Sequence, residues 1–383
     1  MKKRHATSTV VLLLIIAMVL TSVMTTIAVH RAMGVNRELF AEVRQIWEAR
    51  EIIAARYVGQ TDDELLTQAA LAATVAALGD PWSRYLTPEA HEAHLRNALN
   101  QTQGIGISFT RDEETNDIVI VALASGAPAE RAGLEVDETI LTIEGYPTRD
   151  LDSEEIRQII GTQFGYHVEL EVLDISGNGR TVQVAVEEFY TNPVSYEMLE
   201  DDIGYIRIEN FDANSAAEAI TAFEFLINKG AVGIIFDVRR NGGGRLNELL
   251  AILDFLLPEG ELFVYEDADG RERVRMSDEN YFAFPMAVLI DEHSFSAAEF
   301  FAAILQEYEW AEIVGVPTTG KSRSQVTIPL SAGGAVHIST SRYFTPGRVD
   351  LYETGGVQPD HFVENDDSDV DAQLEAAKNL LQR

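Results

Sequence analysis

The pattern of apolar and polar positions changes several times along the chain, and each change predicts a different kind of structure. Residues 8–29 form an apolar run without a single charged side chain. Residues 36–58 carry apolar side chains at helical spacing, which predicts an amphipathic helix. A second helix is expected from Thr61–Glu64, which has the form of a capping box, to Gly79. The aromatic-rich run 78–89 is expected to dock this helical region onto the rest of the chain.

From about residue 103 the period shortens and the pattern predicts strands. They are expected at 104–110, 117–124, 138–145, 167–174 and 181–188, with short helices at 128–132 and 153–160. After Asn192 apolar strands alternate with amphipathic helices. The strands are expected at 204–208, 232–238 and 286–291, and the helices at 215–228, 245–256 and 297–308. This alternation indicates an α/β layered core.

The chain is therefore predicted to be a multi-domain α/β protein. Its expected parts are an N-terminal apolar segment, a helical region, a mostly β domain, an α/β core and a C-terminal helix that follows an acidic linker. Their boundaries are placed at 1–29, 30–95, 96–190, 191–365 and 366–383, with the last helix over about 369–381.

The apolar run predicts a membrane anchor. A helix of about 22 residues is about 33 Å long, which spans a hydrocarbon core of about 30 Å. Lys2, Lys3 and Arg4 precede the run, and basic flanks stay on the cytoplasmic side, so a single-pass protein with an extracytoplasmic catalytic part is expected. The alternative is a signal peptide cleaved after Ala28, which would leave a secreted or periplasmic protein.

Composition excludes several kinds of function. Asp and Glu number 62 against 29 Lys and Arg, a formal net charge of −33. Such a surface repels nucleic acid, so no nucleic-acid partner is expected. The absence of cysteine excludes disulfides, a thiol nucleophile and cysteine-ligated zinc. No HExxH-type spacing occurs, so neither a metal nor another cofactor is expected.

A glycine-rich segment, Gly104-Ile105-Gly106-Ile107, opens the mostly β domain. Its two glycines allow successive backbone N–H groups to turn toward one point, which forms a nest for a carboxylate. The edge of the strand that follows can accept an extended peptide, and helix 153–160 would form the other wall of the groove. Together with the segment 126–145, this pattern resembles a PDZ domain. The resemblance implies that the domain captures protein or peptide substrates with apolar C-termini.

Three further motifs carry the candidate chemistry. Residues 294–299 read Ser-Phe-Ser-Ala-Ala-Glu after an apolar strand, residues 314–321 read Val-Gly-x-x-Thr-x-Gly-Lys, and residues 236–246 read FDVRRNGGGRL. In this order and spacing they resemble the tail-specific, or carboxyl-terminal processing, serine proteases. That family implies a crotonase/Clp-like core. The resemblance extends over about residues 78–360, and in the family the terminal helices serve homodimerisation.

The resemblance assigns a role to each matching residue. Ser296 is the expected nucleophile, Lys321 its base, and Gln325 holds the amine from the same strand face. Gly244, with Gly243 beside it, and Ala297 are the expected oxyanion-hole residues. Such chemistry is physically reasonable, because a serine hydroxyl needs a base and a buried lysine can remain neutral. The N–H of Ala297 would also be a free donor at a helix N-terminus.

Several alternatives remain open at this point. Residues 296–299 also form a capping box, so Ser296 has a structural interpretation. His293 is close to Ser296 in sequence but poorly placed to act as its base. Phe295, Ser322 and Ser324 depart from the family pattern, and the two serines are expected to increase the polarity around Lys321. A catalytically weak PDZ scaffold that binds the C-termini of envelope proteins is therefore the alternative function. A crotonase-like acyl-CoA enzyme is disfavoured by the PDZ-like insert and by the lack of basic contacts for the CoA phosphates.

Overall fold

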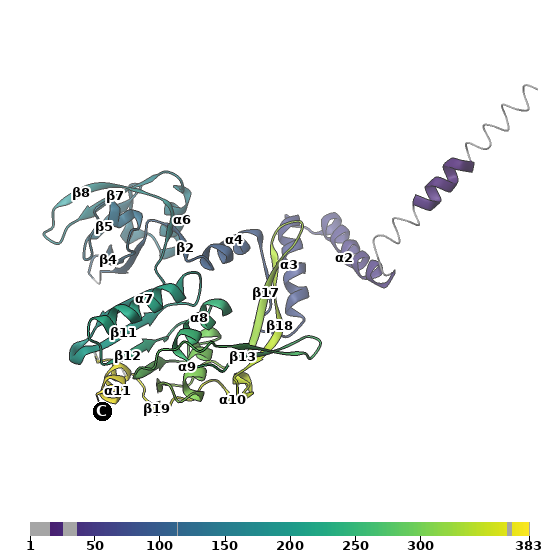
Figure 1. Cartoon of the computed structure of the whole chain (residues 1–383). Coiled ribbons are helices and arrows are strands. Elements are labelled where there is room, and N and C mark those ends of the chain that lie inside the picture. Colours follow the sequence, from purple (N-terminus) through teal and green to yellow (C-terminus); the bar gives the residue numbers. More distant parts are fainter. Residues whose placement is uncertain (1–15, 26–36, 113, 366–369, 383) are drawn as a thin grey trace, which may run out of the picture. The chain divides into compact units, whose positions relative to one another are not determined.

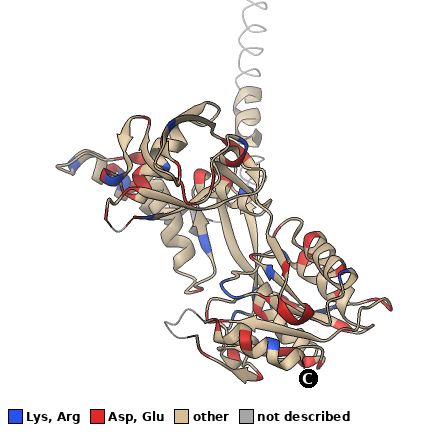
Figure 2. Cartoon of the chain, turned by 90° about the vertical axis from the view of Figure 1, so that its left-hand side faces the viewer, with Lys and Arg blue, Asp and Glu red and all other residues tan. Residues whose placement is uncertain are grey.

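The computed structural model describes residues 16–25, 37–112, 114–365 and 370–382 (Figure 1). The chain divides into two compact units, residues 1–71 and 72–383. Acidic side chains occur on all parts of the second unit, with fewer basic side chains between them (Figure 2).

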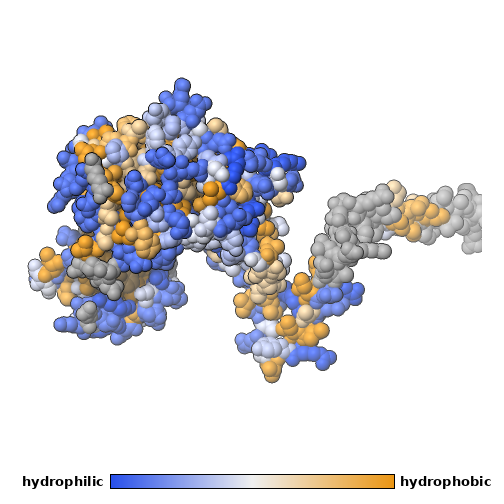
Figure 3. Space-filling model, turned by 90° about the horizontal axis from the view of Figure 1, so that it is seen from below, coloured by the Kyte–Doolittle hydropathy of each residue, from blue (hydrophilic) through white to orange (hydrophobic). Residues whose placement is uncertain are grey.

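The first unit is helical. It contains α2 (Arg37–Arg56) and most of α3 (Asp63–Ala76), as the helical spacing predicts. The cap of α3 is one residue later than expected, because the N–H groups of Glu64 and Leu65 donate to the Asp62 carboxylate at 2.9 and 3.1 Å. Large apolar side chains are exposed on these helices (Figure 3), among them Val43, Ile46, Trp47, Ile52, Ile53 and Leu65.

The predicted membrane-spanning run lies only partly within the described residues. Residues 16–25 are helical, and the rest of 8–29 is outside the described part. No helix among the described residues is both long and apolar enough to cross a bilayer.

The core of the second unit is a six-stranded sheet in the order β10-β11-β12-β15-β16-β19. Only the β10–β11 pair is antiparallel. The strands are β10 (Val194–Met198), β11 (Ile203–Ile208), β12 (Gly233–Asp237), β15 (Met286–Ile290), β16 (Glu312–Gly315) and β19 (His361–Phe362). One face packs on α7 (Ser215–Asn228), α8 (Leu246–Leu256) and α9 (Ala297–Glu307), and the other packs on α11 (Ala372–Leu381). The predicted α/β layering is confirmed.

A second sheet of five strands was not predicted. It runs β1-β18-β13-β14, with β17 also paired to β18. Its strands are β1 (Arg84–Leu86), β13 (Glu261–Asp267), β14 (Glu272–Met276), β17 (Arg323–Pro329) and β18 (Ala335–Phe344). The short helices α4 (Pro88–Asn97) and α10 (Leu351–Thr354) flank these segments in the sequence. This sheet supplies one wall of the site described below.

The mostly β region has its own hydrophobic core. Its six-stranded sheet has the order β3-β4-β5-β7-β8, with β6 paired to β5, and β2 pairs separately with β9. The strands are β2 (Gln101–Gly104), β3 (Ile107–Arg111), β4 (Ile118–Leu123), β5 (Thr139–Ile143), β6 (Tyr146–Pro147), β7 (His167–Leu173), β8 (Gly179–Ala185) and β9 (Glu187–Tyr190). The helices are α5 (Pro128–Arg131) and α6 (Ser153–Thr162). All five strands expected here are present.

Candidate active site

Ser296 stands at the turn between β15 and α9. The strand is buried along its whole length, and the helix begins at the next residue, Ala297. The backbone of Ser296 has φ 59° and ψ −121°, a conformation that is rare for a residue with a side chain. Non-glycine residues in such conformations cluster at active sites, because the surrounding structure must hold them there.

Glu299 connects the turn at Ser296 to the loop that carries Lys321. Its side chain is completely buried. Oε2 accepts the N–H of Ser296 at 2.9 Å and the N–H of Lys321 at 2.8 Å. Oε1 accepts the hydroxyl of Thr318 at 2.8 Å and the N–H of Gly320 at 2.9 Å. The capping contact is therefore real, but the same carboxylate also holds the two predicted catalytic residues together.

The glycine-rich turn after β12 is fixed beside Ser296. Asn241 is fully buried, and its Oδ1 accepts the N–H of Gly243 at 2.8 Å. Its carbonyl accepts the N–H of Phe295 at 3.1 Å, one residue before Ser296. A Cβ on Gly243 would lie 2.8 Å from the Cβ of Ser296 and 2.9 Å from the nitrogen of Ala297. Only glycine permits this approach, which supports the sequence-based importance of Gly243.

Two backbone N–H groups near Ser296 remain available. Gly244 and Phe211 form an isolated parallel β-bridge. In it the N–H of Phe211 donates to the carbonyl of Gly243, and the N–H of Arg245 donates to the carbonyl of Phe211. The N–H of Gly244 has no acceptor among the described residues. The N–H of Ala297 is in the first turn of α9, where a helix has no acceptor for it. The N–H of Gly243, in contrast, is already bonded to Asn241.

A charged cluster supports the start of the same turn. Asp237 is fully buried at the end of β12 and accepts hydrogen bonds from Tyr205, Arg207 and Arg239. Arg239 also binds Asp371, at the N-cap of α11, at 2.7 Å. The C-terminal helix is thus tied directly to the turn that carries Gly243 and Gly244.

Lys321 is buried, with 9% of its surface exposed. Its Nζ lies 4.7 Å from the ring centroid of Trp82 and 5.7 Å from that of Phe295, and the two rings stack at 5.9 Å. Burial, followed by the charge of Arg84, lowers the pKa of Lys321 from 10.5 to about 8, against the opposing charges of Glu299 and Asp80. A substantial fraction of this amine is therefore neutral in mildly alkaline solution.

A cavity of about 790 Å³ brings these groups together. It is lined by Ser296, Ala297, Lys321 and Gln325, by Gly242–Gly244, and by side chains from β1, α4, β17 and β18. The sequence-predicted catalytic and oxyanion residues therefore share one cavity. No group of three or more His, Cys, Asp or Glu side chains that could hold a metal ion occurs among the described residues.

Comparison with known proteins identifies the family. The profile of peptidase family S41 matches residues 202–363. A C-terminal processing peptidase, chloroplastic, of Tetradesmus obliquus is 30% identical over 318 residues, which cover 78% of this chain and 68% of that protein. The chain belongs to peptidase family S41. It is accordingly a serine-type peptidase of the carboxyl-terminal processing class.

Other relatives agree with this assignment. A carboxyl-terminal-processing protease of Synechocystis sp. is 29% identical over 348 residues, covering 88% of this chain and 81% of that protein. A Bacteroides fragilis crystal structure classed as an S41 protease shares the fold with a TM-score of 0.59 at 16% identity. It covers 85% of this chain and 92% of that one.

Two residues that line the candidate site were not recognised in the sequence. Trp82 lies in the aromatic run that was expected only to dock the helical region. Tyr343 is buried in β18, and its hydroxyl donates to the carbonyl of Lys321. Burial raises the pKa of Tyr343, and its hydroxyl also faces Ser296. The aromatic run was a usable signal for Trp82, whereas nothing local to Tyr343 pointed to the site.

Two expectations about the surroundings of Lys321 need correction. Lys321 precedes β17, and a bulge lies between Ser324 and Gln325, so the two residues are not on one strand face. The amide of Gln325 instead donates to the carbonyl of Arg323 at 2.9 Å and to Ser339 at 3.0 Å. Ser322 does not increase the polarity at the amine as expected, because its buried hydroxyl donates to Asp350.

The predicted peptide-binding residues run from Gly104, the last residue of β2, to Ile107, the first residue of β3. Gly104 and Gly106 both have positive φ, 147° and 81°. The side chain of Ile105 is buried in the domain core, so only its backbone can face a ligand, and Ile107 packs partly buried on the same core. β3 is the first strand of its sheet, and its outer edge is not paired within that sheet.

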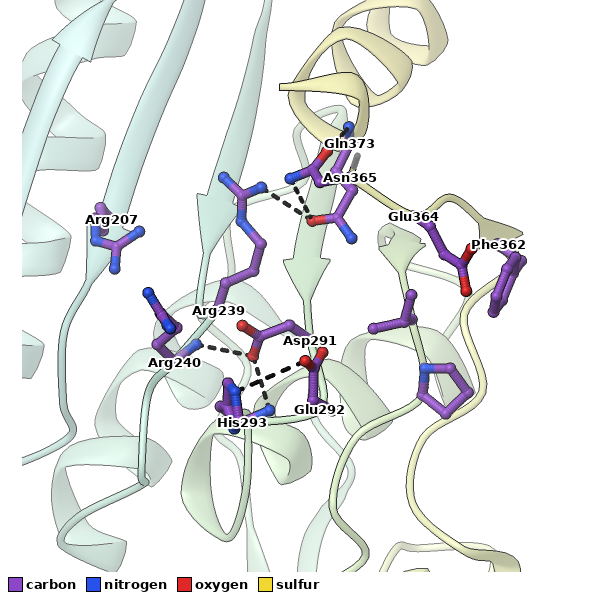
Figure 4. A pocket seen from close by; sticks show the side chains of 12 residues that line it. Arg207, Arg239, Arg240, Asp291, Glu292, His293, Phe362, Glu364, Asn365 and Gln373 are labelled. Carbon is purple, nitrogen blue, oxygen red and sulfur yellow. Dashed lines mark hydrogen bonds and ion pairs between the residues drawn. The ribbon is translucent and has the colours of Figure 1, made fainter. Parts of the chain in front are cut away.

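A second cavity of about 700 Å³ is lined in part by residues 291–293, in the loop that precedes Ser296 (Figure 4). Arg239, Arg240, Asp291 and His293 are among its lining residues. His293 contacts Glu292 at 3.7 Å and its side chain is 58% exposed. His293 does not line the cavity that contains Ser296, which agrees with its exclusion as a base.

Proposed function

We propose that this peptidase cleaves the C-terminal tails of extracytoplasmic proteins with Ser296 as nucleophile and Lys321 as general base. The observation that carries the proposal is the buried Glu299 carboxylate, which binds the N–H groups of both residues through one oxygen. The aromatic cover of the lysine amine and its lowered pKa provide a base that can be neutral before reaction.

The reaction follows from these positions. The neutral amine of Lys321 takes the proton of the Ser296 hydroxyl as its oxygen attacks the peptide carbonyl. The N–H groups of Gly244 and Ala297 stabilise the negative charge on the carbonyl oxygen, assisted by the positive end of α9. The Lys321 ammonium then protonates the leaving amine as the C–N bond breaks. Water then attacks the acyl-serine while Lys321 takes its proton, and the ester bond breaks as Lys321 returns that proton to the Ser296 oxygen.

Recognition of substrate tails is assigned to residues 96–190, as a PDZ-type domain. The unpaired edge of β3 can accept an extended peptide, and the backbone between Gly104 and Ile107 would bind its terminal carboxylate. The apolar run at 8–29, preceded by three basic residues, supports anchoring in the cell membrane with the catalytic part outside. Fractionation of the full chain and protease protection of its C-terminus test that placement.

The catalytic assignment is tested with a full-length chain and an unfolded protein substrate that ends in apolar residues. Ser296→Ala and Lys321→Ala should each abolish cleavage with folding intact. The double variant should be no worse than either, because the two residues act as a unit. Near-normal turnover by Lys321→Ala would show that another base is used.

A further inference from the structure

One wall of the catalytic cavity carries two guanidinium groups without carboxylate partners. Arg84 comes from β1 and Arg323 begins β17, and both line the cavity. Neither side chain makes a hydrogen bond or an ion pair within the described part of the chain. The Arg84 side chain is exposed and that of Arg323 is half-buried, so a ligand in the cavity can reach them.

The lack of partners is unexpected in a chain with 62 acidic and 29 basic residues. Arg342, directly across from Arg323 in β18, is bonded to Asp350 at 2.6 Å. Asp80 acts on Arg323 only from beyond ion-pair distance, and its own oxygens accept the hydroxyl of Ser83 and the N–H of Trp82. Exposed carboxylates are abundant on the surface, yet no Asp or Glu of the described ranges lines the cavity beside Arg84 and Arg323.

The histidines next to Arg84 are neutral. Arg84 in β1 lies opposite His337 in β18, and His337 lies opposite Thr327 in β17. The Thr327 hydroxyl is 2.8 Å from Nδ1 of His337 and 3.0 Å from Nε2 of His94, so one ring donates to it and the other accepts its proton. Burial, then the charge of Arg84, lowers the pKa of both histidines, that of His337 to about 4. The permanent charges of this wall are therefore those of the two arginines.

We propose that Arg84 and Arg323 form a carboxylate subsite in the catalytic groove. The peptidase then prefers peptides that place an acidic side chain or a free C-terminus close to the scissile bond. The inference rests on the proposed function, because Ser296 and Lys321 define the groove. A guanidinium offers a planar fork of donors that matches a carboxylate, and such charge-assisted bonds are strong.

A second set of charged side chains lines the same cavity. Asp212 and Arg245 lie there, and burial raises the pKa of Asp212 to about 6 against the opposing charge of Arg245. At neutral pH most of Asp212 is ionised and repels a second carboxylate. A substrate carboxylate near Arg245 would thus meet the charge of Asp212, whereas one near Arg84 and Arg323 would not.

The test uses the full chain and amidated peptides that differ only by Glu or Gln at one position beside the scissile bond. At one position the kcat/KM for Glu should exceed that for Gln by about tenfold. Arg84→Gln and Arg323→Gln should each bring this ratio close to one. Arg275→Gln is the matched control, since Arg275 is an exposed arginine of the same sheet, in β14, that does not line the cavity. Both peptides are compared at the same pH, so an effect of Arg84→Gln on the pKa of Lys321 changes both rates alike and cancels in their ratio.

A second comparison distinguishes the source of the carboxylate. Neutral peptides with a free or an amidated terminus are compared in the same variants. If the free acid is cleaved faster than the amide, and Arg84→Gln removes the difference, the two arginines bind a terminal carboxylate. If only the replacement of Gln by Glu changes kcat/KM, they bind an acidic side chain. Equal rates for Glu and Gln and for acid and amide, or ratios that Arg84→Gln leaves unchanged, would overturn the inference.

Failure of the proposed chemistry is separable from failure of the subsite. Peptide affinities are measured by fluorescence anisotropy on full-length Ser296→Ala, with and without Arg84→Gln, and thermal melting confirms that each variant is folded. If the unmodified chain cleaves no peptide, the peptidase proposal fails. The preference for Glu over Gln in binding still decides whether the arginine wall selects carboxylates.

Discussion

Lys321 shows how much a single residue depends on its neighbours. Burial removes its amine from water, and Arg84 adds a like charge nearby. Both effects disfavour the ammonium form, which is the form that cannot accept a proton. Phe295, a departure from the family pattern, helps Trp82 to exclude water from this amine, while the faces of both rings also attract a cation.

The activity should therefore rise with pH. Since only the neutral amine is a base, kcat/KM is expected to increase through about pH 8 and then level off, with the midpoint at the pKa of Lys321. Arg84→Gln removes a charge that disfavours the ammonium, so this midpoint should move to higher pH, whereas Arg275→Gln should leave it in place. Peptide hydrolysis measured across this range checks both, and a flat profile would exclude a titrating lysine.

At the scale of elements, the site is made where the loops after β12 and β15 meet. The close approach of Gly243 to Ser296 predicts that Gly243→Ala abolishes cleavage, because the new Cβ would lie within 3 Å of three atoms of the 295–297 segment. Gly270→Ala is the matched control, since Gly270 also has positive φ (75°) but has nothing within 4 Å of its Cβ position. Both variants carry roughly 1–2 kcal/mol of backbone strain, so equal losses of activity would contradict the steric explanation.

The second prediction at this scale concerns Glu299, between α9 and the loop of Lys321. Glu299→Gln keeps the shape but replaces one acceptor oxygen by an amide that cannot accept, so two buried donors lose their partner. The free energy of unfolding should fall by at least about 2 kcal/mol, and cleavage should fall more than this loss of folded protein explains. Denaturant titration and single-turnover rates separate the two effects. Glu309→Gln, an exposed position just after α9, should change neither.

At the scale of the whole molecule, strong acidity affects how tails are found. A net charge of −33 gives an anionic substrate terminus no long-range attraction, so local N–H donors must hold it. Amidating the terminus of a tagged protein substrate, whose scissile bond lies far from that terminus, should therefore sharply reduce its cleavage. Equal cleavage of the acid and the amide would remove tail capture but leave the peptidase assignment standing.

The structure also changes how tail capture should be tested by mutation. A Cβ on Gly106 would lie 2.2 Å from the Cβ of Ala127 and 3.1 Å from the ring of Phe189. Gly106→Val would thus disturb packing within the domain rather than only the approach of a peptide. Modification of the substrate is the cleaner experiment.

The sequence by itself determined the local elements and the order of the motifs. Helix α7 was predicted at its observed bounds, and β11, β12, β15 and α9 within one or two residues. These elements have a clear hydrophobic period, which depends on side chains only a few positions apart. The turns at Gly243 and Ser296 were identified in another way, from motifs that resemble those of the tail-specific proteases.

Only the tertiary structure decided what surrounds those motifs. The second sheet joins β1 to β18 and β17, segments separated by more than two hundred residues, and no local pattern encodes such pairing. Trp82, Arg84 and Tyr343 reach the site through that sheet. Burial lowers the pKa of Lys321, and burial is a property of all the segments that cover it. The motif alone therefore indicated the proposed base but not whether it is neutral.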